Sequence, residues 1–327
     1  MNVVVAVFSR VAVWNLPDVY VERLKQEFPQ HRVMHARNHA EALALVPDAD
    51  VLFGSNLRPA HITAAQRLRW LHTPVAGVRH LLSPDLVHRD IILTNARGMS
   101  AGTIAEHIIG VTLAVFRKLP QAIRAQQERR WAQDEIAVPP ACRMIAGSSV
   151  LVVGLGSIGL AAGRAFSALG GQVVGVKRTA PTSPPSGIAS VHTSDALPSL
   201  LPAADVVVIA APETSATKHL IGAAEFQAMK HDAILVNVSR GGVVDEAALI
   251  AALSANAIGG AALDVFEEEP LPENHPLWSD PRVLITPHTS GFRPDHWDAA
   301  FATFAENLRR FEAGEPLLNV VDKEAGY

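Results

Sequence analysis

The chain has 327 residues, of which 49% are hydrophobic and 18% are charged, and its formal net charge is −4. This composition predicts a compact globular protein rather than a disordered one, and the balanced charge argues against nucleic acid or a membrane surface as the main partner. No apolar stretch approaches the roughly 20 residues that a membrane helix needs, and Cys142 is the only cysteine, so we expect a soluble, cytoplasmic protein without disulfides.

Short β-rich runs alternate with helical patterns along the whole chain, which predicts parallel sheets covered by helices. In the first part, strands are expected at residues 2–9, 32–36, 50–54, 68–73 and 91–96. Helical spacing predicts a helix over 18–28, which Pro29 ends. A longer helix is expected at about 103–117, and its apolar residues cover most of its faces, as in a helix buried between domains or subunits.

The second part repeats the same alternation more regularly. Six strands are expected, at residues 148–154, 171–176, 205–211, 233–238, 259–263 and 282–286, and they predict a doubly wound sheet. The helices between them are clearest at 158–169, 223–229 and 246–253. One amphipathic helix, at about 295–312 and closed by Gly314, follows the last strand.

A residue that could bind a ligand or take part in catalysis follows each expected strand of the second part. They are Gly154, Lys177, Pro212, Arg240, Asp264 and His288. Because ligands of open parallel sheets bind beyond the carboxyl ends of the strands, we expect these residues to meet at one edge of the sheet.

The stretch "GLGSIG" places Gly154, Gly156 and Gly159 between a strand and a helix. Glycines in this position permit a tight turn and let the backbone approach a pyrophosphate, which the helix N-terminus attracts. A glycine turn can also serve packing alone, but its place between strand and helix predicts a dinucleotide site.

The end of the second strand in this part suggests which dinucleotide is bound. An acid there would bind the ribose hydroxyls of NAD and repel a 2′-phosphate, but the sequence has Lys177, Arg178 and Thr179 instead. These side chains would attract the phosphate, so we expect NADP to be preferred and NAD to remain usable. The alternative is that the two basic residues merely begin a solvated loop. No metal is expected.

Several separate motifs resemble the D-isomer-specific 2-hydroxyacid dehydrogenase family. They are "GLGSIG", "NVSRGGVVDE", "ALDVFEEEP" and "TPHTSG", supported by "TPVAGVRHLL", "NARGMSAGTIAEH" and "NLRRFEAGEPLLNVVD". The resemblance covers almost the whole chain. It implies an α/β protein in which a Rossmann cofactor domain (99–292) and a flavodoxin-like substrate domain (1–98 and 293–327) enclose the active site in a cleft. It also implies a homodimer.

The resemblance implies that Arg240, Glu269 and His288 are catalytic. When hydride reaches the carbonyl carbon of a 2-oxo acid, a protonated His288 can donate a proton to the oxygen. Glu269, the third acid of "EEE", would orient the imidazole and favour its charged form. Arg240 offers a planar fork for the substrate carboxylate.

Further contacts follow from the same resemblance. Backbone N–H groups of Ala76 and Gly77 would bind the substrate carboxylate beside Arg240 and His288, unless the glycine serves only turn geometry. His296 and Trp297 could border the pocket, although an aromatic residue on an amphipathic helix is more often core. Asp264 would accept from the nicotinamide carboxamide, or else close a strand-end turn, and Thr103 would lie near the nicotinamide, or else cap its helix. The remaining cofactor contacts are Ser157, Ile158, Pro212, Thr217 and Val238.

We therefore expect an NAD(P)-dependent D-2-hydroxyacid dehydrogenase, acting on the CH–OH group of donors, that reduces glyoxylate or hydroxypyruvate. The alternatives are a phosphoglycerate or phosphite dehydrogenase of the same superfamily. Glu269 argues against formate dehydrogenase, in which glutamine pairs with the histidine. A non-catalytic dinucleotide-sensing protein resembling the family's corepressors is less favoured, because no basic tail or disordered interaction segment is visible.

Overall fold

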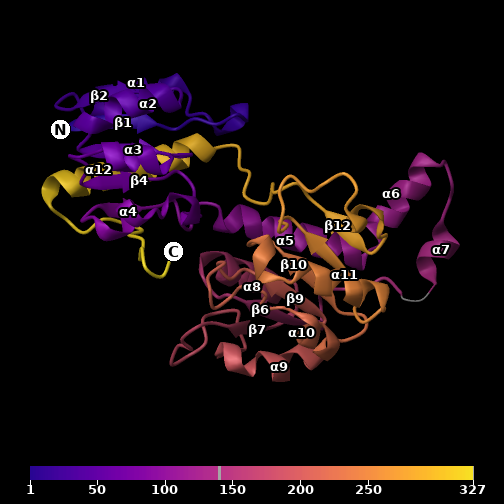
Figure 1. The fold of residues 1–327 in the computed structure, drawn as a ribbon. Coiled ribbons are helices and arrows are strands. Elements are labelled where there is room, and N and C mark those ends of the chain that lie inside the picture. Colours follow the sequence, from indigo (N-terminus) through magenta and orange to yellow (C-terminus); the bar gives the residue numbers. More distant parts are fainter. Residues whose placement is uncertain (139–140, 327) are drawn as a thin grey trace. The chain divides into compact units, whose positions relative to one another are not determined.

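The computed structural model describes residues 1–138 and 141–326. The chain forms two compact units, the first made of Met1–Met99 with Arg293–Tyr327 and the second of Ser100–Phe292, and both are α/β (Figure 1). The boundary after Met99 differs by one residue from the expected boundary after residue 98, and the boundary at Arg293 is the expected one. Which ligand each domain binds stays a prediction. Within the described ranges, no helix combines the length and the apolar character needed to cross a bilayer.

The first unit is built on five parallel strands in the order β2-β1-β3-β4-β5. The strands are β1 (Asn2–Ala6), β2 (Arg32–His35), β3 (Val51–Gly54), β4 (Trp70–His72) and β5 (Ile92–Thr94). The helices are α1 (Asp18–Glu27), α2 (His39–Leu45), α3 (Pro59–Ala64), α4 (Pro84–His88) and α12 (His296–Ala313). This strand order is that of flavodoxin-like sheets, as the family resemblance implies.

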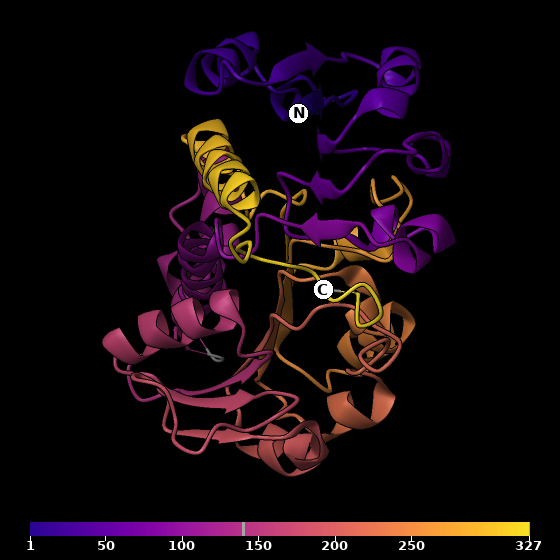
Figure 2. The same ribbon diagram turned by 90° about the vertical axis from the view of Figure 1, so that its left-hand side faces the viewer.

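Helix α12 is the yellow helix in Figure 2. Its aromatic side chains pack on the strands of the first unit. The Phe304 ring stacks on Phe53 with ring centroids 4.4 Å apart and on Trp70 at 5.3 Å. Gly314 ends the helix in the left-handed conformation at φ +69°, where glycine has no steric penalty. The buried aromatic face explains why the end of the chain belongs to the same unit as its beginning.

The second unit contains seven parallel strands in the order β12-β11-β10-β9-β6-β7-β8. They are β6 (Ser149–Val153), β7 (Gln172–Val176), β8 (Ser190–His192), β9 (Val206–Ile209), β10 (Ile234–Asn237), β11 (Gly260–Leu263) and β12 (Val283–Ile285). The expected count of six is wrong, because β8 is missing from it. That strand has only three half-buried residues at the sheet edge, so it lacks the apolar run by which a strand is recognised.

The helices of this unit are α5 (Ala101–Phe116), α6 (Leu119–Gln127), α7 (Gln133–Ala137), α8 (Ser157–Ala168), α9 (Leu197–Leu200), α10 (Ala223–Ala228) and α11 (Glu246–Ser254). Of these, α5 and α8 pack on one face of the sheet, and α9, α10 and α11 pack on the other. Short 3₁₀ turns complete the chain: η1 (Ala12–Trp14), η2 (Val46–Asp48), η3 (Arg79–Leu81), η4 (Ser194–Ala196), η5 (Leu201–Ala203), η6 (Gly241–Val243) and η7 (Pro276–Ser279).

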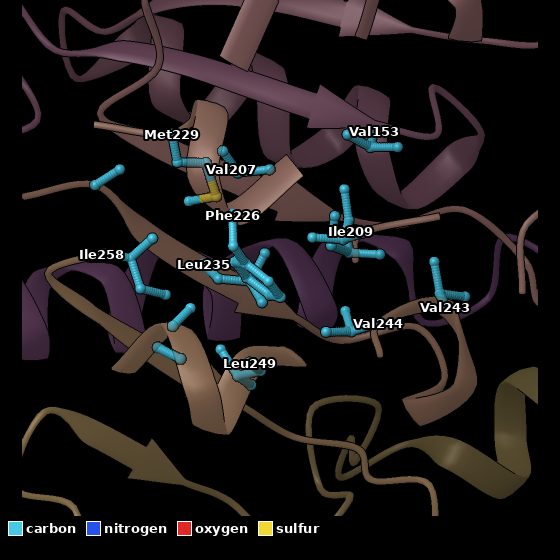
Figure 3. Packing of buried hydrophobic residues seen from close by; sticks show 14 of the residues in the cluster. Val153, Val207, Ile209, Phe226, Met229, Leu235, Val243, Val244, Leu249 and Ile258 are labelled. Atoms are coloured by element: carbon cyan, nitrogen blue, oxygen red, sulfur yellow. The ribbon is translucent and has the colours of Figure 1, made fainter. Parts of the chain in front are cut away.

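Strand β9 shows why these strands read as continuous apolar runs. Val207 and Ile209 point into a core with Phe226 of α10 and Leu249 of α11 (Figure 3). Val206 and Val208 belong to a second core, to which α5 and α8 contribute Ile108 and Phe166. All four β9 side chains are fully buried, as parallel strands covered on both faces should be.

The order of the strands reverses between β6 and β9. The chain leaves β6 for β7 on one side and later returns to add β9 on the other, so these neighbours mark the point where strand order reverses. In doubly wound sheets the carboxyl ends of such strands receive the ligand. Gly154, which follows β6, lies at that point.

Candidate active site

Two of the three glycines after β6 are required by the turn itself. Gly154 has φ +101°, and a Cβ built on it would lie 2.4 Å from the backbone N of Ala211, beyond β9. A Cβ on Gly159 would lie 2.0 Å from the carbonyl oxygen of Gly154. Gly156 differs, because no atom lies within 4 Å of its Cβ position. Gly156 therefore leaves open space in front of the backbone.

That open space lies at the N-terminus of α8. Gly156 is the N-cap residue and has no side chain to satisfy the first N–H groups of the helix, which also have no partner within the helix. These N–H groups and the helix dipole can hold a pyrophosphate, so the residues fit a bound dinucleotide. Leu155 fixes the turn by packing over Gly175 of β7, where a Cβ would lie 2.0 Å from the leucine Cδ1.

The basic residues lie at the end of β7, beside the edge strand β8. The Lys177 N–H donates to the carbonyl oxygen of His192 at 2.9 Å, which fixes the backbone where the strand ends. The side chains of Lys177, Arg178 and Thr179 are exposed there. Two positive charges and a hydroxyl group are therefore available at this strand end, and such groups bind phosphate.

The loop after β9 uses its predicted binding residues to stabilise its own turn. The Thr217 hydroxyl donates to the carbonyl of Pro212 at 2.6 Å and accepts from the Thr214 N–H at 2.8 Å. Val238, which follows β10, is buried. Cofactor contacts of these residues stay predictions, and for Thr217 the structure shows a role in loop geometry.

The segment that carries Arg240 touches the segment that carries Glu269. A Cβ on Gly241 would lie 1.9 Å from the carbonyl carbon of Phe266 and 2.3 Å from the N of Glu267, so only a glycine allows this approach of the two backbones. The carbonyl of Arg240 is held by Asn237 Nδ2 at 3.0 Å. Two loops from neighbouring strands are thus joined at one point.

Glu269 and His288 form a direct pair. The Glu269 Oε2 lies 2.6 Å from His288 Nδ1, and its Oε1 accepts from the Phe266 N–H at 3.0 Å. Burial alone would raise the pKa of Glu269, but hydrogen bonds from His288 and Phe266 and the charge of Arg240 outweigh it and lower the pKa. The carboxylate is therefore ionised and accepts a hydrogen bond from Nδ1–H. Nε2 is then the ring nitrogen that can exchange a proton with a substrate.

The backbone of His288 has an unusual conformation that Asp264 supports. His288 has φ +53°, a left-handed conformation uncommon outside glycine. Its N–H donates to the carbonyl of Asp264 at 2.9 Å. The Asp264 carboxylate, 1% exposed, accepts from the N–H groups of Thr289 and Ser290 at 2.9 Å each and from the Thr286 hydroxyl at 2.6 Å. Asp264 thus holds the loop that carries His288, and its predicted contact with a carboxamide remains a prediction.

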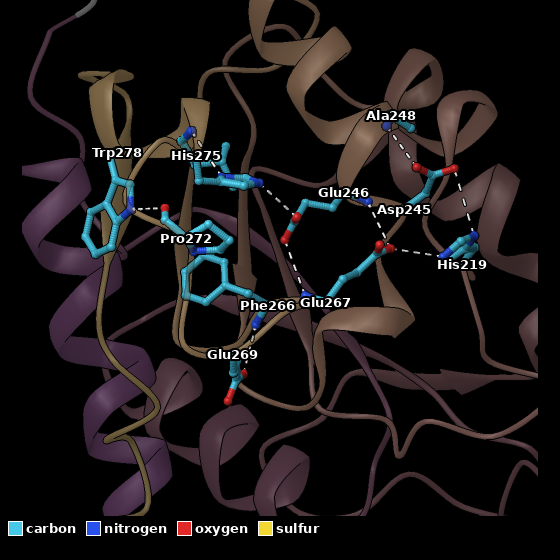
Figure 4. A network of polar contacts seen from close by, with 11 residues as sticks. His219, Asp245, Glu246, Ala248, Phe266, Glu267, Glu269, Pro272, His275 and Trp278 are labelled. Atoms are coloured by element: carbon cyan, nitrogen blue, oxygen red, sulfur yellow. Dashed lines mark hydrogen bonds and ion pairs between the residues drawn. The ribbon is translucent and has the colours of Figure 1, made fainter.

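A polar network ties the Glu269 loop to α11 (Figure 4). Glu267 Oε1 lies 3.0 Å from His219 Nε2, and Glu246 Oε1 lies 3.1 Å from His275 Nε2. The N–H of Glu267 and a carboxylate oxygen of Glu246 are 3.4 Å apart. Sequence reasoning missed this network, since histidines and acids distant along the chain carry no mark of their pairing.

Other predicted residues lie elsewhere. Thr103 lies within α5, whose N-cap residue is Ser100, so the alternative that Thr103 caps the helix is wrong. The remaining four, Ala76, Gly77, His296 and Trp297, belong to the first unit.

In that unit the carbonyl of Ala76 accepts from Asn95 Nδ2 at 2.7 Å. The His296 ring lies edge-on to Trp14 and Trp297, with ring centroids 5.1 and 4.7 Å apart. Over the residues described, no three histidine, cysteine or acidic side chains gather as metal ligands would.

Residues 109–290 match the model of the family described as D-isomer specific 2-hydroxyacid dehydrogenase, NAD binding domain. The chain is 32% identical to a glyoxylate reductase of Thermofilum pendens, with 94% of this chain and 89% of that protein covered. It is 31% identical to a D-3-phosphoglycerate dehydrogenase of Methanocaldococcus jannaschii over 92% of this chain but only 57% of that protein.

Among solved structures, a D-isomer specific 2-hydroxyacid dehydrogenase of Xanthobacter autotrophicus, in complex with NADPH and MES, has a similar fold. It is 32% identical, with a TM-score of 0.84, and the comparison covers 100% of this chain and 99% of that one.

Proposed function

The chain belongs to the D-isomer specific 2-hydroxyacid dehydrogenase family, whose members are oxidoreductases of the CH–OH group, and on that premise we propose that it reduces small 2-oxo acids with NADPH. The expected substrates are of the glyoxylate or hydroxypyruvate type, and the products are D-2-hydroxy acids. The observation that carries the proposal is the pairing of Glu269 with His288 beside the loop of Arg240.

The three side chains divide the chemistry of carbonyl reduction among them. Bound NADPH supplies the hydride. Arg240 binds the substrate carboxylate through its guanidinium and polarises the neighbouring carbonyl. His288 donates the proton from Nε2 to the oxygen that becomes the hydroxyl, and takes it back in the reverse direction. Glu269, held by the Phe266 N–H, keeps Nδ1 engaged so that Nε2 faces the reaction.

Preference for NADPH rests on the end of β7. Lys177 and Arg178 add two positive charges, and Thr179 adds a hydroxyl, where an NAD site would carry an acid. The Xanthobacter relative binds NADPH, which agrees with this proposal. NAD use at lower efficiency is part of it, because the glycine turn serves both dinucleotides.

The proposed function is tested with a panel of 2-oxo acids assayed with NADPH and with NADH. We expect kcat/KM to be highest for glyoxylate or hydroxypyruvate with NADPH. The panel includes 3-phosphoglycerate with both oxidised cofactors because of the similarity to a phosphoglycerate dehydrogenase, and also phosphite. Faster turnover of either would replace the proposed substrate class. No turnover of any member would favour a dinucleotide-sensing protein.

The cofactor preference has its own test. The double variant K177D/R178S should raise the KM for NADPH at least tenfold and change that for NADH less than threefold, because only NADPH carries the 2′-phosphate. The matched control K25D/R32S makes the same charge change at exposed positions of the first unit. Equal losses with both cofactors would contradict the phosphate site.

We also propose that the protein is a cytoplasmic homodimer. Helix α6 and the segment after it expose apolar side chains, with Leu119 46%, Ile123 53% and Trp131 91% exposed, and such side chains favour a protein contact. Light scattering in solution should give twice the chain mass of 34.9 kDa. A value equal to the chain mass would contradict the dimer.

A further inference from the structure

We propose that His107 and Thr286 are positioning residues that hold the His288 loop in its reactive geometry by way of Asp264. This inference rests on the proposed function. It concerns two side chains that sequence reasoning left out, one from α5 and one from the loop after β12. Both lie in the second unit.

The hydrogen-bond directions between these residues can be deduced. The Thr286 hydroxyl lies 2.6 Å from Asp264 Oδ1, and a carboxylate only accepts. Its single proton is therefore committed to Asp264. His107 Nε2 lies 3.2 Å from the same hydroxyl oxygen, so the imidazole must be the donor there. His107 thus carries its proton on Nε2, and a chain runs from His107 through Thr286 to Asp264.

The surroundings of His107 fit this role. Its side chain is 18% exposed, and Nε2 lies 3.9 Å from Asp264 Oδ1. Burial lowers the pKa of His107, and the charge of Asp264 offsets this only in part. Burial favours a neutral imidazole, and the contact with the Thr286 hydroxyl places its proton on Nε2.

These hydrogen bonds from His107 through Thr286 to Asp264 matter because the His288 backbone that they support is strained. His288 has φ +53°, a conformation that costs free energy for a residue with a side chain and persists only when its neighbours enforce it. Asp264 enforces it by binding the N–H groups of Thr289 and Ser290. A buried carboxylate deprived of a donor moves or rehydrates, and His288 would then lose its alignment with the substrate.

Four variants separate this role from simple packing. T286V and H107L keep the approximate shape of the side chains and remove the donors. T286S and H107Q keep a donor at a comparable reach. The matched control is H231L, at an exposed histidine of the same unit. All are measured for kcat on the best 2-oxo acid, for KM of NADPH, and for amide hydrogen exchange in residues 286–290.

We expect T286V and H107L to lower kcat about tenfold, as the loss of one buried hydrogen bond would. The KM for NADPH should stay within about twofold, and the amides of Thr289 and Ser290 should exchange about tenfold faster. T286S, H107Q and H231L should stay within about twofold of the unsubstituted protein in all three measurements.

Two results would overturn the inference. One is an unchanged kcat together with unchanged amide exchange in T286V and H107L. The other is a loss in T286S and H107Q as large as in the apolar variants, which would indicate packing alone. If the unsubstituted protein turns over no 2-oxo acid, the proposed function fails, whereas the exchange measurement still decides whether the loop is held by this chain of hydrogen bonds.

Discussion

The imidazole of His72 should make the first unit sensitive to acid. The side chain is fully buried among Trp70, Phe53 and Phe304. Its Nδ1 lies 2.8 Å from the Thr94 hydroxyl, and its Nε2 has no partner. Burial lowers the pKa of His72 from 6.5 to about 3, because a charged imidazolium cannot be solvated there.

The sign and size of the effect follow from proton linkage. Between the two pKa values the unfolded chain binds a proton at His72 that the folded chain does not. The free energy of unfolding therefore falls as the pH falls from 6.5 towards 3. Going from about pH 7 to about pH 5, this single residue should remove about 2 kcal/mol of stability.

The variant H72L isolates this contribution. Urea unfolding is measured at about pH 7 and about pH 5 for both proteins, and the two pH-dependent losses are subtracted. Any constant cost of the substitution cancels, and the Thr94 hydroxyl keeps its bond from Trp70 Nε1 at 2.8 Å. H72L should lose about 2 kcal/mol less than the unsubstituted protein, while H231L, at an exposed histidine, should lose as much. Equal losses in H72L and the unsubstituted protein would refute a buried neutral imidazole.

Three further substitutions test the candidate site. G156A should fold normally, because nothing lies within 4 Å of the new methyl group, yet raise the Kd of NADPH at least tenfold in a fluorescence titration by occupying the pyrophosphate space; unchanged affinity would place the cofactor elsewhere. G241A should lower kcat at least a hundredfold and also lower Tm, since its Cβ would lie 1.9 Å from the Phe266 carbonyl carbon and force the Arg240 and Glu269 loops apart. G222A, whose Cβ would make only ordinary contacts at 3.6 Å, is the control for both and should match the unsubstituted protein. H288A should bind NADPH with unchanged Kd and lose at least a hundredfold in kcat; near-normal turnover would contradict its role as proton donor.

Long apolar runs made most of the fold predictable. The strands of the second sheet are recognised because both faces are covered, so Val206, Val207, Val208 and Ile209 are all apolar. Several elements were not predicted. Strand β8 has only three half-buried residues. The helices α2, α3, α4, α7 and α9 have seven residues or fewer, which is too short for a helical period to repeat clearly. Helix α6, with nine residues, was also not predicted.

The candidate site was predictable in part, for a geometric reason. Parallel strands end at one edge, so residues that follow β10, β11 and β12 are expected to converge, and this applies to Arg240, Asp264 and His288. Glu269 lies further along its loop, beyond the reach of that argument. Only the family resemblance selects it from three consecutive acids, although the structure then pairs it with His288 at 2.6 Å.

The contacts that hold these side chains in place leave almost no mark in the sequence. Gly241 looks like any loop glycine, yet its lack of a Cβ lets the Arg240 loop touch the backbone of Phe266. Asp264 is a predictable strand-end acid, but its donors are backbone N–H groups of ordinary loop residues. Since proton and hydride transfer require atoms aligned to within a fraction of an ångström, such backbone contacts must constrain the reaction as strongly as the identities of the reacting side chains do. A related chain could therefore keep Arg240, Glu269 and His288 and still lose activity through a methyl group added at residue 241.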